Sequence, residues 1–469
     1  MSLPRRSQSA LEYMMTYGWA ILVIVIVAAV LYSLGIFSPS SSLSTTITGF
    51  SNLGTVNAVC LGGTSFTISM GDSTGYPINI TQINLTSSSG KTTYSPNILI
   101  QPNSIQTVTV PSSSLCTSGA RYSVSAVISY LEPGQILPGP YTSTGTVTGT
   151  AASPPSSATS YEPLNITNTQ NQGTPSPFQQ MINVTSTSPG WGDISSSPFG
   201  QNVEFFSSTG QILDSWLENY TSTRAIWWVK LTSSIPAGSK QTIYMGFAPT
   251  STNLFNTNDV GEAPQLSTTY GEYDDGANVF NNYWNFAGTS FPTGFTNYNN
   301  GGTSTVDNGL NISLASSGNY YAFVYNTAIS PDSIVETYST GKRTNGPTDL
   351  GAYPSNSESV TGFAGVANTW GWGYGTISGG YGNIGNPFDI SSGSGVASIY
   401  WIGTGDEGVG WNYDFVSSTY SITIPSSIYL SIGMGNNCGS SDLVYYWLRT
   451  RTYPPNGVMP PVSFGSVSQ

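Results

Sequence analysis

The feature that most constrains this chain is an uncharged apolar run near its start. Tyr13 to Phe37 contains 25 residues without a charge, and the next charged residue after Glu12 is Asp72. A helix rises about 1.5 Å per residue, so a helix of this length could cross a bilayer. The run is too long for the apolar part of a secretory signal, and no Ala-x-Ala site follows it. We therefore expect it to be retained in a membrane.

The residues around the run bear on its role. Arg5 and Arg6 precede it, and positive charge favours the cytoplasmic side. A plain membrane anchor would explain the run. However, a carboxylate such as Glu12 is costly beside lipid unless it is paired or interfacial. Small residues within the run would also let one helix pack closely on another, namely Gly18, Ala20, Ala28 and Ala29.

The stretch Arg5 to Tyr13, followed by MMTYGWAILVIVIV, resembles the class III leader and N-terminal helix of archaeal type IV pilins. The resemblance implies that prepilin peptidase removes a leader, residues 1–7, by cutting between Ser7 and Gln8. Ser7 stands where that family prefers Gly. Glu12 then occupies the fifth mature position, and residues 8–37 form a helix that lies first in the membrane and then in a filament core.

Two residues would serve subunit assembly. In a filament core the new amine of Gln8 would be buried, and a buried ammonium is costly without a partner. Glu12 of a neighbouring subunit could supply that partner. The alternative for Glu12 is a carboxylate near a helix N-terminus, where the helix dipole favours negative charge.

Composition limits the possible functions. Only 7% of the 469 residues are charged, the net charge is −12, and histidine is absent. Nucleic acid is excluded as a partner because there is no basic patch to displace its counterions. The lack of histidine removes the commonest general base and the commonest zinc ligand. We predict no metal, no cofactor and no catalytic residue.

Cysteine usage indicates an extracellular location. Cys60 and Cys116 lie 56 residues apart within one strand-rich stretch. We predict a disulfide between them, worth about 3–4 kcal/mol on the chain-entropy model; two buried free thiols are the alternative. Cys438 has no nearby partner in the sequence, and we expect it to be a buried thiol.

Residues 44–150 alternate between apolar and polar in short runs separated by Gly, Pro, Asn and Ser, which predicts a β-sandwich. We expect this to be the pilin head domain. The predicted strands are 65–70, 78–85, 98–100, 105–110 and 122–130. Residues 151–160 lose the alternation and gain Pro and Ser, which indicates a linker.

Two further β domains are predicted. In residues 161–262 the predicted strands are 181–186, 202–206, 226–231 and 241–247. This stretch resembles a small β-sandwich family of unassigned function. The motifs that carry the resemblance are Asp214-Ser215-Trp216, Trp228-Val229-Lys230 and Ile243-Tyr244-Met245-Gly246. That family often precedes concanavalin-like domains. Residues 263–469 resemble a concanavalin-like or laminin-G-like jelly-roll. The predicted fold class is mainly β: a long N-terminal hydrophobic α-helix followed by three β-sandwich or jelly-roll domains.

Three patterns could carry chemistry in the last domain. Asp274-Asp275 suggests Ca²⁺ binding or an acidic turn, and Asp406-Glu407 suggests a glycosidase pair or a solvated turn. No Glu-x-Asp-x-x-Glu signature of glucanases occurs in residues 263–469. Trp370, Trp372 and Tyr374 occupy every second position, so their rings would lie on the same face of a strand. They could bind sugar or pack between two sheets.

Six Asn-x-Ser/Thr sequons are candidate glycosylation sites: Asn79, Asn84, Asn165, Asn183, Asn219 and Asn311. Such sequons also arise by chance in a chain rich in Ser, Thr and Asn.

We predict a structural subunit of an extracellular type IV pilus-like filament, with outer β domains that mediate adhesion. Its partners would be copies of itself, prepilin peptidase and the pilus assembly machinery, and glycans or cell surfaces. Before assembly it would be anchored in the inner membrane. The alternative is a monomeric membrane-anchored surface adhesin or glycan-binding protein, and an anchored glycan hydrolase comes third.

Overall fold

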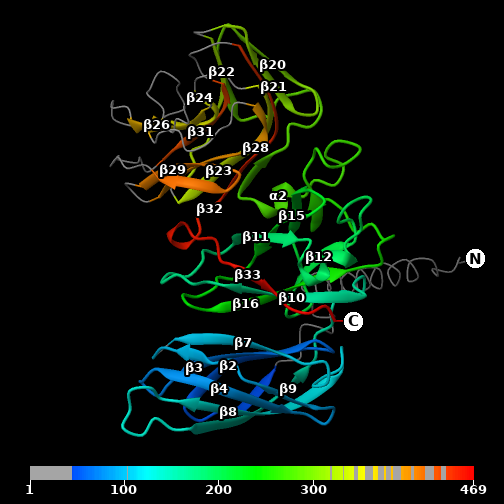
Figure 1. Ribbon diagram of the computed structural model, residues 1–469, viewed down its shortest axis with the longest axis vertical. Helices are drawn as coiled ribbons and strands as arrows, with labels where there is room; N and C mark the ends of the chain where they lie inside the picture. Colours follow the sequence, from blue (N-terminus) through cyan, green and yellow to red (C-terminus); the bar gives the residue numbers. More distant parts are fainter. Residues whose placement is uncertain are drawn as a thin grey trace, which may run out of the picture. The chain divides into compact units, whose positions relative to one another are not determined.

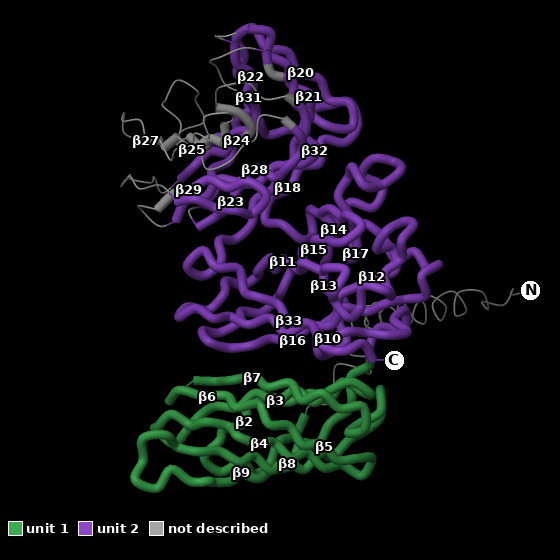
Figure 2. Tube along the Cα trace, in the orientation of Figure 1, with its two compact units in different colours: residues 1–153 green, residues 154–469 purple. Residues whose placement is uncertain are grey.

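The computed structural model shows two compact units, divided between Ser153 and Pro154 (Figure 2). It describes residues 45–468 apart from 103, 317–318, 331, 343–346, 354–362, 368–373, 376–381, 384–391, 403–405, 418–426 and 435–439. Each unit is described separately below. The first unit ends within the stretch that the sequence predicts to be a linker, residues 151–160.

The first unit is a sandwich of two antiparallel sheets (Figure 1). The larger sheet has the order β1-β9-β8-β4-β5, with β6 also paired to β4; the strands are β1 (Thr46–Gly49), β4 (Ile78–Thr86), β5 (Lys91–Tyr94), β6 (Ile98–Ile100), β8 (Arg121–Leu131) and β9 (Tyr141–Thr150). The smaller sheet has the order β2-β3-β7; its strands are β2 (Leu53–Leu61), β3 (Ser65–Asp72) and β7 (Ile105–Pro111).

Alternation along these strands builds the core of the first unit. In β8 every second side chain from Tyr122 to Tyr130 is buried, while the residues between them are more exposed. The buried face packs against residues of the smaller sheet such as Phe66 and Ile68. A disulfide joins Cys60 of β2 to Cys116, which lies between β7 and β8. The predicted disulfide is therefore confirmed.

The second unit begins with a middle sandwich. One of its sheets has the order β13-β12-β16-β10-β33; the strands are β10 (Ser160–Thr167), β12 (Val203–Ser207), β13 (Ile212–Leu213), β16 (Lys240–Phe247) and β33 (Val462–Phe464). The other has the order β11-β15-β14-β17; the strands are β11 (Phe178–Thr185), β14 (Ser215–Tyr220), β15 (Arg224–Leu231) and β17 (Val260–Glu262). A 3-10 turn, η1 (Pro189–Asp193), follows β11.

The second unit continues with a larger sandwich of jelly-roll type. One sheet has the order β20-β21-β32-β23-β28-β29-β30, with β18 on β32; the strands are β18 (Asn282–Trp284), β20 (Gly302–Val306), β21 (Leu310–Leu314), β23 (Ser333–Lys342), β28 (Ser392–Ile402), β29 (Asp406–Trp411), β30 (Asp414–Ser417) and β32 (Ser441–Thr452). The facing sheet has the order β19-β22-β31-β24-β25; the strands are β19 (Phe295–Asn300), β22 (Tyr320–Tyr325), β24 (Pro347–Tyr353), β25 (Phe363–Ala367) and β31 (Tyr429–Met434). A short pair, β26 (Tyr374–Gly375) and β27 (Gly382–Asn383), stands apart.

The two sandwiches of the second unit share a core. Trp216 and Trp228, on the outer face of the β11-β15-β14-β17 sheet, pack with Trp447 of β32. The sheet that carries β32 thus has apolar contacts on both faces, one inside its own sandwich and one toward the middle sandwich. This explains why the two sandwiches form one compact unit.

The end of the chain also ties them together. After β32, the chain passes through the 3-10 turn η2 (Pro455–Gly457) and returns to the middle sandwich. There β33 adds to the edge of β10, with Leu164 opposite Phe464. The middle sandwich is therefore completed by residues from the end of the chain.

The predicted fold class is wrong about the helix. The described residues are almost entirely β-sheet, and their one α-helix is α2 (Gly276–Val279), of four residues. Within the described residues no helix is long and apolar enough to span a membrane. The helix predicted for residues 8–37 lies outside the described residues. That prediction rested on the length of the apolar run, whereas the stability of a helix also depends on how it packs against other elements.

Loss of the disulfide should weaken the first unit specifically. We expect replacement of both Cys60 and Cys116 by Ser to lower its free energy of unfolding by about 3–4 kcal/mol, because the unfolded chain regains its freedom. Differential scanning calorimetry would show one transition moving down. A reductant should shift the wild-type transition likewise and leave the double variant unchanged; an unaltered transition in the double variant would contradict the expectation.

Candidate functional site

The site in the second unit begins with an irregularity in β32. The register of β32 against β23 skips Tyr446. Tyr445 packs inside the larger sandwich, whereas Trp447 contacts the middle sandwich. A bulge shifts the alternation of side chains between the two faces. Arg449 and Arg451 follow Trp447 at intervals of two and point the same way.

These two arginines form a buried ion network with two glutamates. Arg449 Nη2 lies 2.8 Å from Glu218 Oε2 of β14 and 2.7 Å from Glu336 Oε2 of β23. Arg451 donates to Glu336 Oε1 through Nε at 3.0 Å and Nη2 at 2.8 Å. All four side chains are buried. The network therefore contains two positive and two negative groups, and it joins the middle sandwich to the larger one.

The network keeps its charges despite burial. Burial by itself would raise the pKa of Glu336, but the positive charges of Arg451 and Arg449 outweigh it and hold that pKa below its usual value. Burial would lower the pKa of Arg449, but Glu336, Tyr413 and Glu218 together outweigh it and raise that pKa. A buried carboxylate with two cationic partners stays ionised.

Aromatic rings enclose Arg449. Its Cζ atom lies 4.4 Å from the ring centroids of Phe280 and Trp447, 4.6 Å from that of Trp228 and 5.4 Å from that of Trp216. The negative face of an aromatic ring attracts a guanidinium, most strongly where water is excluded. The rings thus replace part of the hydration that Arg449 loses on folding.

Tyr413 enters the network from the tip of a hairpin. Strands β29 and β30 are joined by Asn412 and Tyr413, whose φ angles are 50° and 72°. Left-handed conformation suits a tight hairpin but strains a bulky residue. The Tyr413 hydroxyl donates to Glu218 Oε2 and accepts from Arg449 Nη2 at 3.0 Å. These bonds help to hold Tyr413 in its strained conformation.

Asp274 anchors the other side of the aromatic cluster. Its Oδ1 accepts from Trp216 Nε1 at 2.8 Å, and its Oδ2 accepts from Asn285 Nδ2 at 2.8 Å and from the Tyr283 hydroxyl at 2.9 Å. Burial raises its pKa. Its oxygens are occupied by protein donors, so the arrangement does not favour the Ca²⁺ alternative. Within the described residues no three His, Cys, Asp or Glu side chains are grouped to hold a metal ion.

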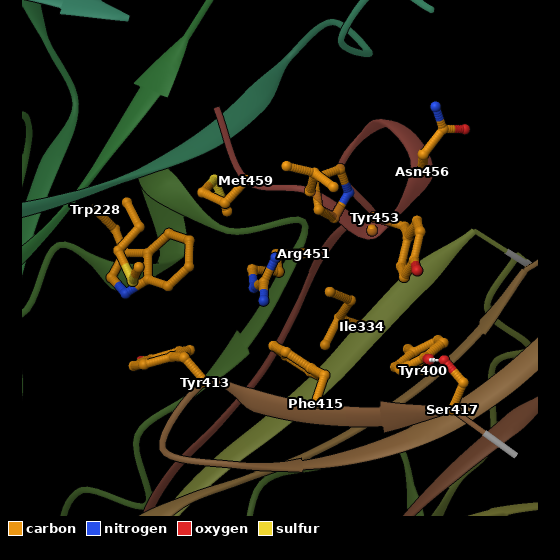
Figure 3. Close-up of a pocket in the computed structure, with 14 residues that line it drawn as sticks. Trp228, Ile334, Tyr400, Tyr413, Phe415, Ser417, Arg451, Tyr453, Asn456 and Met459 are labelled. Atoms are coloured by element: carbon orange, nitrogen blue, oxygen red, sulfur yellow. Dashed lines mark hydrogen bonds between the residues drawn. The ribbon is translucent and has the colours of Figure 1, made fainter. Parts of the chain in front are cut away.

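A cavity of about 470 Å³ is lined by Arg451, among other residues of the second unit. Figure 3 shows Arg451 near its centre, with the rings of Trp228 and Tyr413 on one side and those of Tyr400 and Tyr453 on the other. The described lining residues include one charged side chain, Arg451. A volume of this size is typical of small-molecule sites.

Several residues singled out in the sequence lie away from this cavity or outside the described residues. Trp370, Trp372 and Cys438 lie outside them, as do Ser7, Gln8 and Glu12. Tyr374 falls in β26, and its side chain is not described. Asp406 and Glu407 begin strand β29 rather than forming a turn, and their side chains are likewise outside the description.

The six sequons all lie on strands. Asn79 and Asn84 are on β4, Asn165 on β10, Asn183 on β11, Asn219 on β14 and Asn311 on β21. None of the six is buried, and Asn183 is exposed. Their glycosylation stays a prediction.

Sequence reasoning missed the ion network. One signal was present: β32 reads SDLVYYWLRTRT and holds two of only 11 basic residues in the chain, at alternate positions beside aromatic residues. Their partners Glu218 and Glu336 lie far away in the sequence, so spacing could not reveal them.

Part of the second unit is similar to a known domain family. Residues 199–294 match a domain of unknown function (DUF2341). The chain is also 32% identical over 350 residues to "Uncharacterized protein 562" of Sulfolobus islandicus rod-shaped virus 1. That match includes 63% of this chain and spans 57% of the length of the viral protein.

Solved structures similar to part of the chain include glycoside-cleaving enzymes and a carbohydrate recognition domain. One comes from work on endo-acting O-glycanases of the human gut microbiota (8% identity, TM-score 0.28, 37% of this chain and 99% of that one). Another is the catalytic domain of an endo-1,3-beta-glucanase (laminarinase) from Thermotoga petrophila RKU-1 (11%, 0.27, 36% and 96%). A third is the Emp47p carbohydrate recognition domain (11%, 0.24, 36% and 92%).

Removal of Arg449 should destabilise the whole second unit. In Arg449→Leu, Glu218 and Glu336 lose a buried partner, so we expect a loss of about 3–5 kcal/mol in the free energy of unfolding, measured by urea denaturation. Lys230→Ala is the matched control, since it breaks a partly exposed pair with Asp214 at 3.1 Å and should cost about 1 kcal/mol or less. Equal losses in the two variants would refute a stabilising role of the network.

Two other buried carboxylates predict how stability changes with pH. Burial raises the pKa of Glu162, and also that of Asp275, from ordinary values to about 7. A carboxyl group with a raised folded-state pKa stabilises the fold most when it is protonated. This contribution is complete below the unfolded pKa of about 4.5 and is lost as the pH rises through about 7.

Replacement of Glu162 by Gln should flatten this profile. We expect wild-type stability to fall between pH 4.5 and pH 8, with Glu162 contributing about 1–3 kcal/mol of the decrease. The variant should therefore gain stability relative to the wild type at pH 8, as urea denaturation at several pH values would show. Asp307→Asn, at an exposed position, is the control. A variant profile parallel to the wild type would contradict the assignment.

Proposed function

We propose that this protein is a structural subunit of an extracellular type IV pilus-like filament, and that its β-sandwich units mediate adhesion. The observation that carries the proposal is the N-terminal sequence. Arg5, Arg6, Ser7 and Gln8 precede an uncharged apolar segment, with Glu12 five residues into the expected mature chain. Neither an ordinary secretory signal nor a plain anchor requires this combination.

The described part of the chain supports an exterior location. The disulfide Cys60–Cys116 is typical of proteins in oxidising compartments. Intracellular proteins of hyperthermophiles also hold disulfides, so the disulfide supports the proposal less strongly than the N-terminal sequence does. The low fraction of charged residues, 7%, with Ser, Thr, Asn and Gly in their place, gives a surface that changes its charge little with pH.

The proposed role is binding and assembly without catalysis. Glu218 and Glu336 are buried and Asp274 is half-buried; all three are bonded to arginine, tryptophan or tyrosine side chains, so they stabilise the fold. Before assembly, the apolar segment would hold the subunit in the inner membrane. After cleavage, the amine of Gln8 and the carboxylate of Glu12 on a neighbouring copy would pair as subunits assemble.

The mature N-terminus tests the proposal directly. Mass spectrometry of the protein from sheared surface material should find a chain that begins at Gln8, and electron microscopy should show filaments. Glu12→Gln should still be cleaved but should form few or no filaments, because the isostere cannot neutralise the buried amine. Ser9→Ala is the control that should assemble normally.

Two results would reject the filament. An intact N-terminus at Met1 or Ser2 in the membrane fraction would indicate the monomeric surface adhesin instead. Cleaved protein that forms no filaments, with Glu12→Gln indistinguishable from the wild type, would likewise remove the assembly role.

A further inference from the structure

The cavity beside Arg451 combines aromatic walls with polar groups. Phe415 is among its lining residues and is 37% exposed. The Tyr400 ring packs edge-on against Phe415, and its hydroxyl lies 2.6 Å from Ser417 Oγ. Tyr453 contributes a further ring from the segment that follows β32. The cavity thus presents both ring faces and hydroxyl groups.

The cavity is preformed by contacts on several sides. The Tyr453–Met459 segment forms one wall, and Asn456 in that segment donates to Gln170 Oε1 at 3.1 Å and to Asn171 Oδ1 at 3.0 Å in the middle sandwich. Tyr413, on another wall, is bonded to Glu218. Binding to preformed walls loses little conformational entropy.

One hydrogen-bond donor at the floor has no partner. Arg451 is 2% exposed, and its Nε and Nη2 are bonded to Glu336. Its Nη1 is buried and makes no hydrogen bond. A buried donor without an acceptor costs about 1–3 kcal/mol, and the side chain that carries it belongs to a residue lining the cavity.

Charge balance indicates a neutral acceptor. Glu336 already neutralises Arg451, and the surrounding network has equal numbers of positive and negative groups. The chain as a whole carries −12. An anionic group would therefore approach a site without excess positive charge, whereas a hydroxyl or ring oxygen could accept from Nη1 without that penalty.

We propose that this cavity binds a neutral saccharide, with one sugar ring stacked on Phe415 and a sugar oxygen facing Arg451. A sugar presents C–H groups on one face, which suit the negative face of an aromatic ring, and hydroxyls around its edge, which suit Ser417 and the tyrosine hydroxyls. The inference deepens the adhesive part of the proposed function and rests on it for its biological setting.

The binding test uses the full-length chain in a detergent without a sugar headgroup. Maltotriose, cellotriose, mannotriose and chitotriose are titrated as neutral probes, and trigalacturonate as the acidic one. Isothermal titration calorimetry measures affinity, and tryptophan fluorescence reports on Trp228 in the cavity wall. We expect saturable binding of at least one neutral probe, tighter than that of trigalacturonate.

Variants locate the binding. Phe415→Ala should weaken binding at least tenfold, because it removes the exposed ring while leaving the buried network intact. Arg451→Lys should weaken binding as well, since lysine keeps the charge beside Glu336 but lacks the second guanidinium arm. Tyr76→Ala is the control, because Tyr76 is an aromatic residue 51% exposed in the first unit; it should bind as the wild type does.

Several results would overturn the inference: no binding of any neutral probe, unchanged binding by Phe415→Ala, or tighter binding of trigalacturonate. If Arg451→Lys fails to fold, Phe415→Ala still shows whether the saccharide binds in this cavity. If the protein is cleaved before Gln8 and forms filaments but binds no saccharide, only the proposal of saccharide binding is refuted. If the protein binds saccharide but keeps its leader, only the proposal of a filament subunit is refuted.

Discussion

The structure of the second unit depends on the burial of Arg449. A guanidinium without water is tolerated only where carboxylates and ring faces replace its hydration. Glu218 comes from the middle sandwich and Glu336 from the larger one, and the enclosing rings come from both parts of the unit. Separation of the sandwiches would therefore expose three tryptophans and divide the ion network, so we infer that they fold together.

This coupling determines where the second unit can bind a ligand. The middle sandwich covers the outer face of the sheet that contains β32, around Trp447 and Arg449. The cavity lies where that cover ends, beside Arg451 and the β29–β30 hairpin. The network that stabilises the unit thus also supplies the floor of the candidate site. Its glutamate Glu336 has a lowered pKa, so acid should not readily disrupt it.

Much of the strand pattern could be predicted from the sequence, because alternation follows directly from burial of one sheet face. The stretches 78–85 and 122–130 correspond closely to β4 (Ile78–Thr86) and β8 (Arg121–Leu131). The cysteine pairing was predictable because both residues lie in one unit. The ion network could not be predicted, because the bulge at Tyr446 decides which way Arg449 points. A bulge leaves little trace in composition. Nor could alternation show that the outer faces of two sandwiches pack together.

The most direct test of the coupling is native-state hydrogen exchange of the full-length protein, followed by mass spectrometry of peptides from β15 and β32. If the buried network makes the two sandwiches one cooperative unit, amides in both strands should open with the same free energy and the same dependence on denaturant. Opening of β15 at a clearly lower free energy, while β32 stays protected, would show two independent domains and contradict the account.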